Sequence, residues 1–158
     1  MGLRHDISNR NPIDDDRDYQ LDGLYQKGYI LTMREPSDKP AMKPLIWVGS
    51  SKIDLDAFPG PARREAGYAL YLAQIGMKAL KAKPLHGFGG ASVLEVMEDH
   101  DGNTYRAVYT VKFAGMVFVL HAFQKKSKKG IATPKADIDL IKQRLTLAAE
   151  QYKQLVRE

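Results

Sequence analysis

The sequence predicts an α+β fold built on a small, mostly antiparallel sheet. Three observations support this class: short strand patterns separated by turn residues cluster in the middle of the chain, an amphipathic helix pattern precedes them, and a second one ends the chain. The expected order is strand, helix, three-stranded meander and C-terminal helix, because consecutive strands joined by short turns pair antiparallel.

The first strand is expected at Pro44–Ser50, PLIWVGS, and the first helix after it. Asp56 is a plausible helix cap, and Pro59 suits a helix start because a missing N–H costs little there. An apolar stripe then runs to Gly76, a residue typical of a helix end: Ala66, Ala69, Leu70, Leu72, Ala73 and Ile75.

Residues 77–90 predict a short helical turn and a glycine-rich loop, and the meander follows. HDGN at 100–103 and Ala114-Gly115 supply the turn residues between its strands. The three strands are expected in ASVLEVMED (91–99), TYRAVYTVKF (104–113) and GMVFVLHAF (115–123).

Thr133-Pro134 predicts the start of the final helix. Its apolar residues keep steps of three and four, which place them on one face. They are Ile138, Ile141, Leu145, Ala148, Tyr152 and Leu155.

Residues 1–42 are polar, with six basic and eight acidic side chains, and are interpreted as a flexible extension of a domain at 43–158. The chain has no cysteine, so disulfide and thiolate chemistry are excluded. No apolar run reaches the roughly 18 residues of a membrane span, and no signal-peptide core is present, so a cytoplasmic protein is expected.

Positive charge is concentrated late in the chain. Residues 106–144 hold nine basic and two acidic side chains, a net charge of +7, against +5 for the whole chain. Four lysines lie within six residues: Lys125, Lys126, Lys128 and Lys129. Such a run indicates a polyanionic partner, or else a solvated loop that protects a sheet edge.

Several common chemistries lack their residues. The four histidines, at 5, 86, 100 and 121, are scattered and no cysteine assists them, so no metal site is expected. GFGG at 87–90 lacks the GK[ST] ending of a phosphate loop. Ser92 lies in a strand without a nucleophile elbow, so a serine triad has no support.

What remains is a set of cations at strand ends. Alternation places Arg106, Val108 and Thr110 on one face of their strand and Tyr105, Ala107 and Tyr109 on the other. In the next strand His121 alternates with Leu120 and Ala122 and shares its face with Phe123 and Lys125.

If these two strands pair as a hairpin, Arg106 and Lys125 both lie toward the end away from Ala114-Gly115. Two plainer interpretations stay open. Arg106 can be a salt-bridging arginine beside Glu95, and His121 can be a half-buried histidine whose ring nitrogens are satisfied by neighbours.

Four motifs in order, KPLHGFG, GNTYRAVYTVKF, VFVLHAFQKKSKKG and TP, followed by a C-terminal RL helix, resemble the RelE/HigB toxin superfamily. The resemblance covers about residues 43–148 and is greatest to the phage-derived HigB-type proteins. It implies a RelE-like fold and a ribosome-dependent mRNA endoribonuclease inhibited by a helix-turn-helix antitoxin.

The resemblance implies chemistry without metal or other cofactor. A ribose 2′-OH attacks the adjacent phosphate, giving a 2′,3′-cyclic phosphate and a free 5′-OH. Arg106 inherits a phosphate-binding catalytic role, and Lys125, with Lys126 beside it, inherits the second cation. The general base is open between His86, His121 and a lysine.

Other cations are expected to dock on ribosomal RNA through phosphate contacts. They are Lys83, Lys126, Lys128, Lys129, Lys135 and Lys142. The chain departs from the family pattern at Met97, where a basic residue commonly follows the glutamate matched by Glu95. The alternative function is therefore a non-catalytic module that binds RNA or protein on the same fold.

Overall fold

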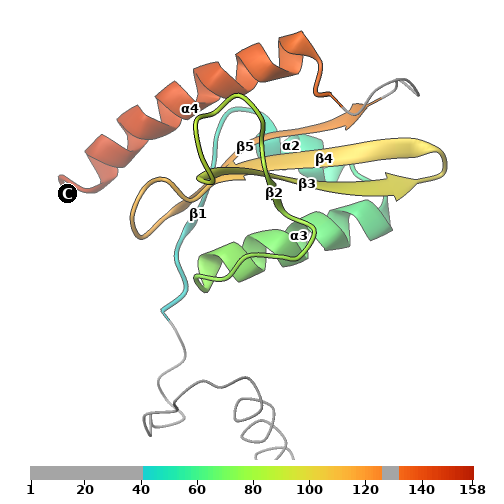
Figure 1. Ribbon diagram of the computed structural model, residues 1–158. Helices are drawn as coiled ribbons and strands as arrows, with labels where there is room; N and C mark the ends of the chain where they lie inside the picture. Colours follow the sequence, from blue (N-terminus) through green and yellow to red (C-terminus); the bar gives the residue numbers. More distant parts are fainter. Residues whose placement is uncertain (1–40, 126–131) are drawn as a thin grey trace, which may run out of the picture. The chain divides into compact units, whose positions relative to one another are not determined.

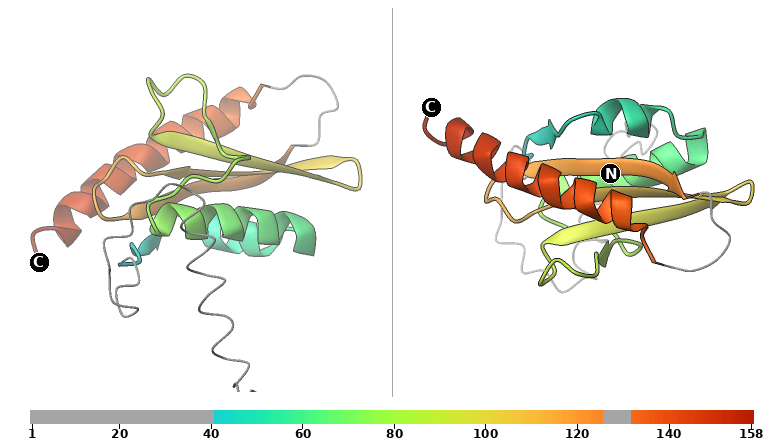
Figure 2. Two further views of the ribbon diagram at one scale, coloured as in Figure 1. Left: turned by 60° about the horizontal axis from the view of Figure 1, so that its bottom comes forward. Right: turned by 90° about the horizontal axis from the view of Figure 1, so that it is seen from above.

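The computed structural model describes residues 41–125 and 132–158. A five-stranded sheet forms the middle layer; α2 (Ser51–Asp56) and α3 (Gly60–Gln74) cover one face, and α4 (Lys135–Leu155) covers the other (Figure 1). The two views of Figure 2 show the same three layers from below and above. We call the two sides of the sheet the α3 face and the α4 face. The predicted α+β class is confirmed.

The sheet is mixed but mostly antiparallel. Its order is β1-β5-β4-β3-β2, with β1 parallel to β5 and the remaining neighbours antiparallel. The strands are β1 (Leu45–Trp47), β2 (Lys83–Pro84), β3 (Val93–His100), β4 (Asn103–Thr110) and β5 (Val117–Lys125).

Both predicted turns of the meander are present. Asp101 and Gly102 join β3 to β4 with φ of 50° and 77°, the left-handed values of a tight hairpin turn that suits the Asp-Gly pair. Gly115, with φ of 79°, lies in the loop between β4 and β5.

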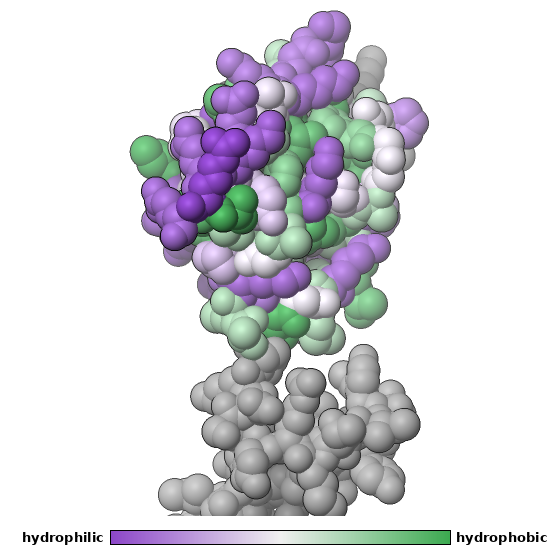
Figure 3. All heavy atoms as spheres, turned by 90° about the vertical axis from the view of Figure 1, so that its left-hand side faces the viewer, coloured by the Kyte–Doolittle hydropathy of each residue, from purple (hydrophilic) through white to green (hydrophobic). Residues whose placement is uncertain are grey.

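Apolar side chains fill both sides of the sheet. On the α3 face, small residues of α3 bring the helix backbone close to the strands: Ala62, Ala66, Ala69 and Ala73. On the α4 face, Ile141 and Ala148 pack with Phe118 and Leu120 of β5. The outer surface is more hydrophilic, as the side chains along the top of Figure 3 show.

A β-bulge in β5 sets which residues face α4. Val108 pairs with His121 and Tyr109 pairs with Val119, so Leu120 has no partner residue in β4. Beyond the bulge His121, Phe123 and Lys125 therefore face α4, as Leu120 does. The expected alternation of His121 with Leu120 is wrong for that reason, whereas its shared face with Phe123 and Lys125 is confirmed.

Three local expectations need correction. The first strand is shorter than predicted, and β2 was expected to be loop. Asp56 does not cap α3: it is the last residue of a separate helix, α2, and Pro59 occupies the position before α3. The Pro-Gly-Pro run at 59–61 ends one helix and starts another because proline fixes φ and has no N–H to donate.

The extension predicted at residues 1–42 lies outside the described residues, apart from Ala41 and Met42. Within the described ranges, no helix combines the length and the hydropathy that crossing a bilayer requires.

Replacing Tyr109 by Phe is expected to raise the free energy of unfolding by about 1 kcal/mol. The Tyr109 hydroxyl is buried and has no hydrogen-bond partner among the described residues. Burial also raises the pKa of Tyr109 from 10.0 to about 12, so this group stabilises the fold fully below pH 10 and its contribution falls as the pH rises from 10 to about 12.

The variant should lose that alkaline dependence. Denaturant unfolding at neutral pH and at about pH 11 measures both effects. Tyr68→Phe, at an exposed position of α3, is the control. A Tyr109→Phe protein less stable than wild type at neutral pH would contradict the expectation.

Candidate functional site

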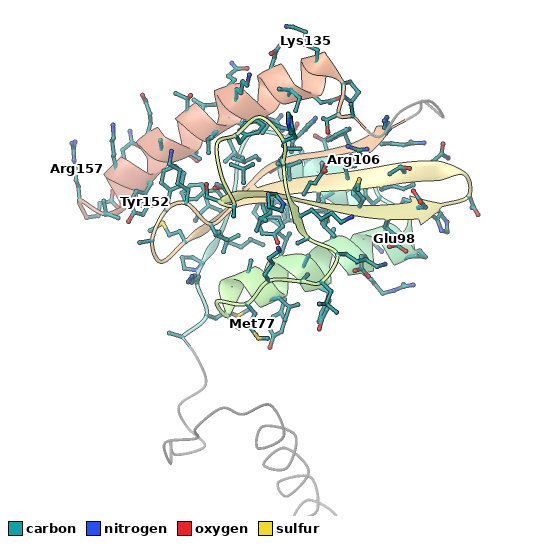
Figure 4. All side chains as sticks on the ribbon, in the orientation of Figure 1. Met77, Glu98, Arg106, Lys135, Tyr152 and Arg157 are labelled. Carbon is teal, nitrogen blue, oxygen red and sulfur yellow. The ribbon has the colours of Figure 1, made fainter. Side chains whose placement is uncertain are left out.

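Arg106 and Lys125 lie on the same face of the sheet. Arg106 pairs across the strands with Phe123, and Lys125 pairs with Thr104, all on the α4 face. The view with side chains places Arg106 between the sheet and the start of α4 (Figure 4). The expected meeting of two cations at the end of the hairpin away from Gly115 is confirmed.

Both cations are buried under one short segment. Arg106 Nη1 donates to Thr133 Oγ1 at 2.8 Å and lies 3.3 Å from Glu95 Oε2, and Lys125 Nζ donates to the Ala132 carbonyl at 2.9 Å. Arg106 is 3% exposed and Lys125 8%. Buried charges are tolerated when they are paired and hydrogen-bonded, as here.

A cavity of about 490 Å³ adjoins these contacts. Glu95 and Thr133, the partners of Arg106, form part of its wall, and His86 of the glycine-rich loop forms another part. The remaining lining residues are Pro84, Leu85, Gly87, Ala132 and Ile138. The structure thus brings His86 and Glu95 to one hollow beside the guanidinium of Arg106.

His121 is engaged at both ring nitrogens. Nε2 lies 2.8 Å from Asp137 Oδ1, and Nδ1 lies 3.3 Å from Nη1 of Arg144. A guanidinium can only donate, so Nδ1 accepts and the neutral ring carries its proton on Nε2, which donates to Asp137. The ring also stacks on Phe123 with 4.7 Å between centroids.

Arg144 connects α4 to two other elements. Its Nη1 donates to the Leu120 carbonyl at 2.9 Å, and its Nη2 donates to Ser50 Oγ at 2.8 Å. Gly49, with φ of +57°, lies so close that an added Cβ would be 3.0 Å from the guanidinium. The loop before α2 is therefore shaped around this side chain.

The cations expected to bind RNA are spread more widely. Lys83 is exposed on β2. Lys135 starts α4, where a hydrogen bond to Asp139 at 2.7 Å raises the pKa of the lysine and lowers that of the aspartate. Lys126, Lys128 and Lys129 lie outside the described residues.

Sequence reasoning missed Thr133, Asp137 and Arg144. Arg144 carries a readable signal, since it falls three residues after Ile141 and four before Ala148, on the apolar stripe that packs on the sheet. A cation on such a stripe indicates a buried polar partner. Thr133 and Asp137 give no comparable signal because their partners are distant in sequence.

Residues 53–146 match the family described as phage derived protein Gp49-like (DUF891). The match spans more than half of the chain. The chain belongs to the Gp49-like family. This family is part of the RelE/HigB-like toxin group, so the resemblance seen in the sequence is confirmed at that level. A search of curated proteins found no match.

The site of this Gp49-like protein differs from the family pattern where the sequence departs. Met97 pairs across the strands with Arg106, so a thioether stands at the position where relatives commonly have a basic residue. No group of three His, Asp or Glu side chains suited to a metal ion occurs in the described ranges 41–125 and 132–158.

Replacing Arg144 by Leu is expected to lower the free energy of unfolding by about 2–3 kcal/mol, because the Leu120 carbonyl and His121 lose a charged donor. Lys142→Leu, at an exposed position of the same helix, should change it by less than about 0.5 kcal/mol. Denaturant titration of the three proteins measures the difference. Equal losses in the two variants would show that Arg144 anchors nothing.

Proposed function

We propose that this Gp49-like protein is the toxin of a type II toxin–antitoxin pair and cleaves mRNA on the ribosome without a metal ion. The 2′-oxygen of one nucleotide forms a bond to phosphorus, and the bond from phosphorus to the 5′-oxygen of the next nucleotide breaks. The products are a 2′,3′-cyclic phosphate and a 5′-OH. A base takes the proton of the 2′-OH, and an acid protonates the departing 5′-oxygen.

The observation that carries the proposal is the placement of Arg106 and Lys125 on adjoining strands, on one face, under the same two residues. The pentacoordinate transition state bears more negative charge than the phosphodiester. Cations held in place before the reaction stabilise that extra charge without reorganising. Phosphate oxygens would replace Thr133 and Ala132 as acceptors.

Two histidines are candidates for proton transfer. His86 lines the cavity and is exposed, so it can reach a ribose 2′-OH seated there. His121 faces the same side of the sheet, but its nitrogens are occupied by Asp137 and Arg144. We therefore assign proton transfer first to His86 and give His121 the role of holding Phe123 and α4 in place.

The remaining parts of the proposal concern partners. Lys83 and Lys135 are exposed cations that would contact ribosomal RNA phosphates, together with Lys126, Lys128, Lys129 and Lys142. Membership in a toxin group implies an antitoxin, here proposed to be a helix-turn-helix protein.

A non-catalytic RNA- or protein-binding module is the second candidate. The pairing of Met97 with Arg106 favours it, because the site then has one cation fewer than the family pattern. This alternative predicts salt-sensitive RNA binding that survives Arg106→Ala and produces no new 5′-OH ends.

Replacing Arg106 by Ala is expected to lower the rate of mRNA cleavage about 100-fold or more, because it removes a donor aimed at the developing charge. Arg106→Lys keeps the charge but loses the planar fork, so its rate should fall between the two. Mapping 5′-OH ends on translated mRNA with purified ribosomes measures the rates.

Arg64→Ala is the matched control, since Arg64 is exposed on α3, on the other side of the sheet. Thermal unfolding of each protein separates lost activity from lost folding. Cleavage by Arg106→Ala at the wild-type rate, or no cleavage by the wild-type protein, would refute the nuclease proposal.

A further inference from the structure

The cavity beside Arg106 has two kinds of wall. Pro84, Leu85 and Ile138 present apolar groups, whereas His86, Glu95 and Thr133 present polar ones. Its volume of about 490 Å³ lies in the range of roughly 300–1,000 Å³ that is usual for small-molecule sites.

The cavity adjoins the proposed phosphate position. Arg106 Nη1 contacts Thr133 at 2.8 Å and Glu95 at 3.3 Å, and both residues are part of the cavity wall. A phosphate oxygen bound by the same nitrogen would therefore lie at the cavity edge. The nucleoside attached to that phosphate has the cavity as its nearest enclosed space.

The walls match the chemistry of a nucleobase. A base is a flat ring with apolar faces and a polar edge, and proteins bind unstacked bases by covering the faces and hydrogen-bonding the edge. The apolar side chains would cover a face, and the imidazole of His86 can stack against a ring. Glu95 would meet the edge.

Glu95 also gives the cavity a preference. A carboxylate accepts hydrogen bonds and donates none, so it favours bases that present an amino group. Adenine, guanine and cytosine carry such a group. Uracil offers one N–H between two carbonyl oxygens, which the carboxylate repels.

We infer that this cavity binds the nucleobase adjoining the scissile phosphate and favours amino-bearing bases over uracil through Glu95. The inference rests on the proposed function for the position of the phosphate. It adds a base-reading site to a reaction that otherwise requires phosphate contacts alone.

Binding to the full-length protein, without ribosomes, tests the inference by calorimetry or NMR titration. The probes are inorganic phosphate and the 3′-monophosphates of adenosine, guanosine, cytidine and uridine. The three amino-bearing nucleotides should bind about tenfold more tightly than uridine 3′-monophosphate, as expected for a hydrogen bond to a charged group. Glu95→Gln should remove that difference, and Glu98→Gln, the next acid along β3, should not.

Filling the cavity gives a second test. Ile138→Trp should weaken all four nucleotides to the level of inorganic phosphate and leave phosphate binding unchanged, because Ile138 lines the cavity but does not contact Arg106 in the described hydrogen-bond set. Leu147→Trp, exposed on the same helix, is the matched control and should bind like wild type.

The outcomes separate the two proposals. If Arg106→Ala abolishes phosphate binding but the nucleosides add no affinity, the cavity inference fails and the phosphate site stands. Nucleotides that bind a folded Ile138→Trp protein as they bind wild type also overturn it. If phosphate binds wild type and Arg106→Ala equally, or binds neither, the phosphate site fails and the inference fails with it.

Discussion

One extra residue in β5 determines the chemistry that the sheet can present. Leu120 has no partner in β4, and the strand beyond it is shifted by one residue. Without this bulge, Lys125 would point to the α3 face, beside Ala107 and Tyr105, because a shift of one residue moves every side chain to the other side. Arg106 would then face α4 without a second cation from β5.

The bulge is held from outside the sheet. It leaves a carbonyl on Leu120, which Arg144 of α4 satisfies at 2.9 Å. The same guanidinium reaches His121 and Ser50, so the helix, the bulge and the loop before α2 are fixed by one side chain. A buried carbonyl without a donor would cost about 1–3 kcal/mol, so α4 and the bulged strand stabilise each other. The cation site thus depends on a helix that supplies neither cation.

This arrangement explains which features the sequence could predict. Alternation alone placed Arg106 with Val108 and Lys125 with His121, because each set lies on one side of the bulge or in a regular strand. The bulge itself was not predictable, since Val117–Lys125 is apolar on both faces before it and the pattern shows no break. Glu95 was anticipated as a partner of Arg106, and the two lie 3.3 Å apart. Thr133 and Ala132 were not, because their contacts join residues brought together only by the fold.

The charge balance of the site bears on how the proposed nuclease would select the transition state. Arg106, Lys125 and Glu95 together carry a net charge of +1. The two cations already donate to neutral oxygens of Thr133 and Ala132, so an incoming phosphate exchanges neutral acceptors for charged ones. That exchange becomes more favourable as negative charge develops, because hydrogen bonds to charged acceptors are about twice as strong as neutral ones. Burial under these residues therefore weakens ground-state binding more than transition-state binding, which is the condition for catalysis rather than mere affinity.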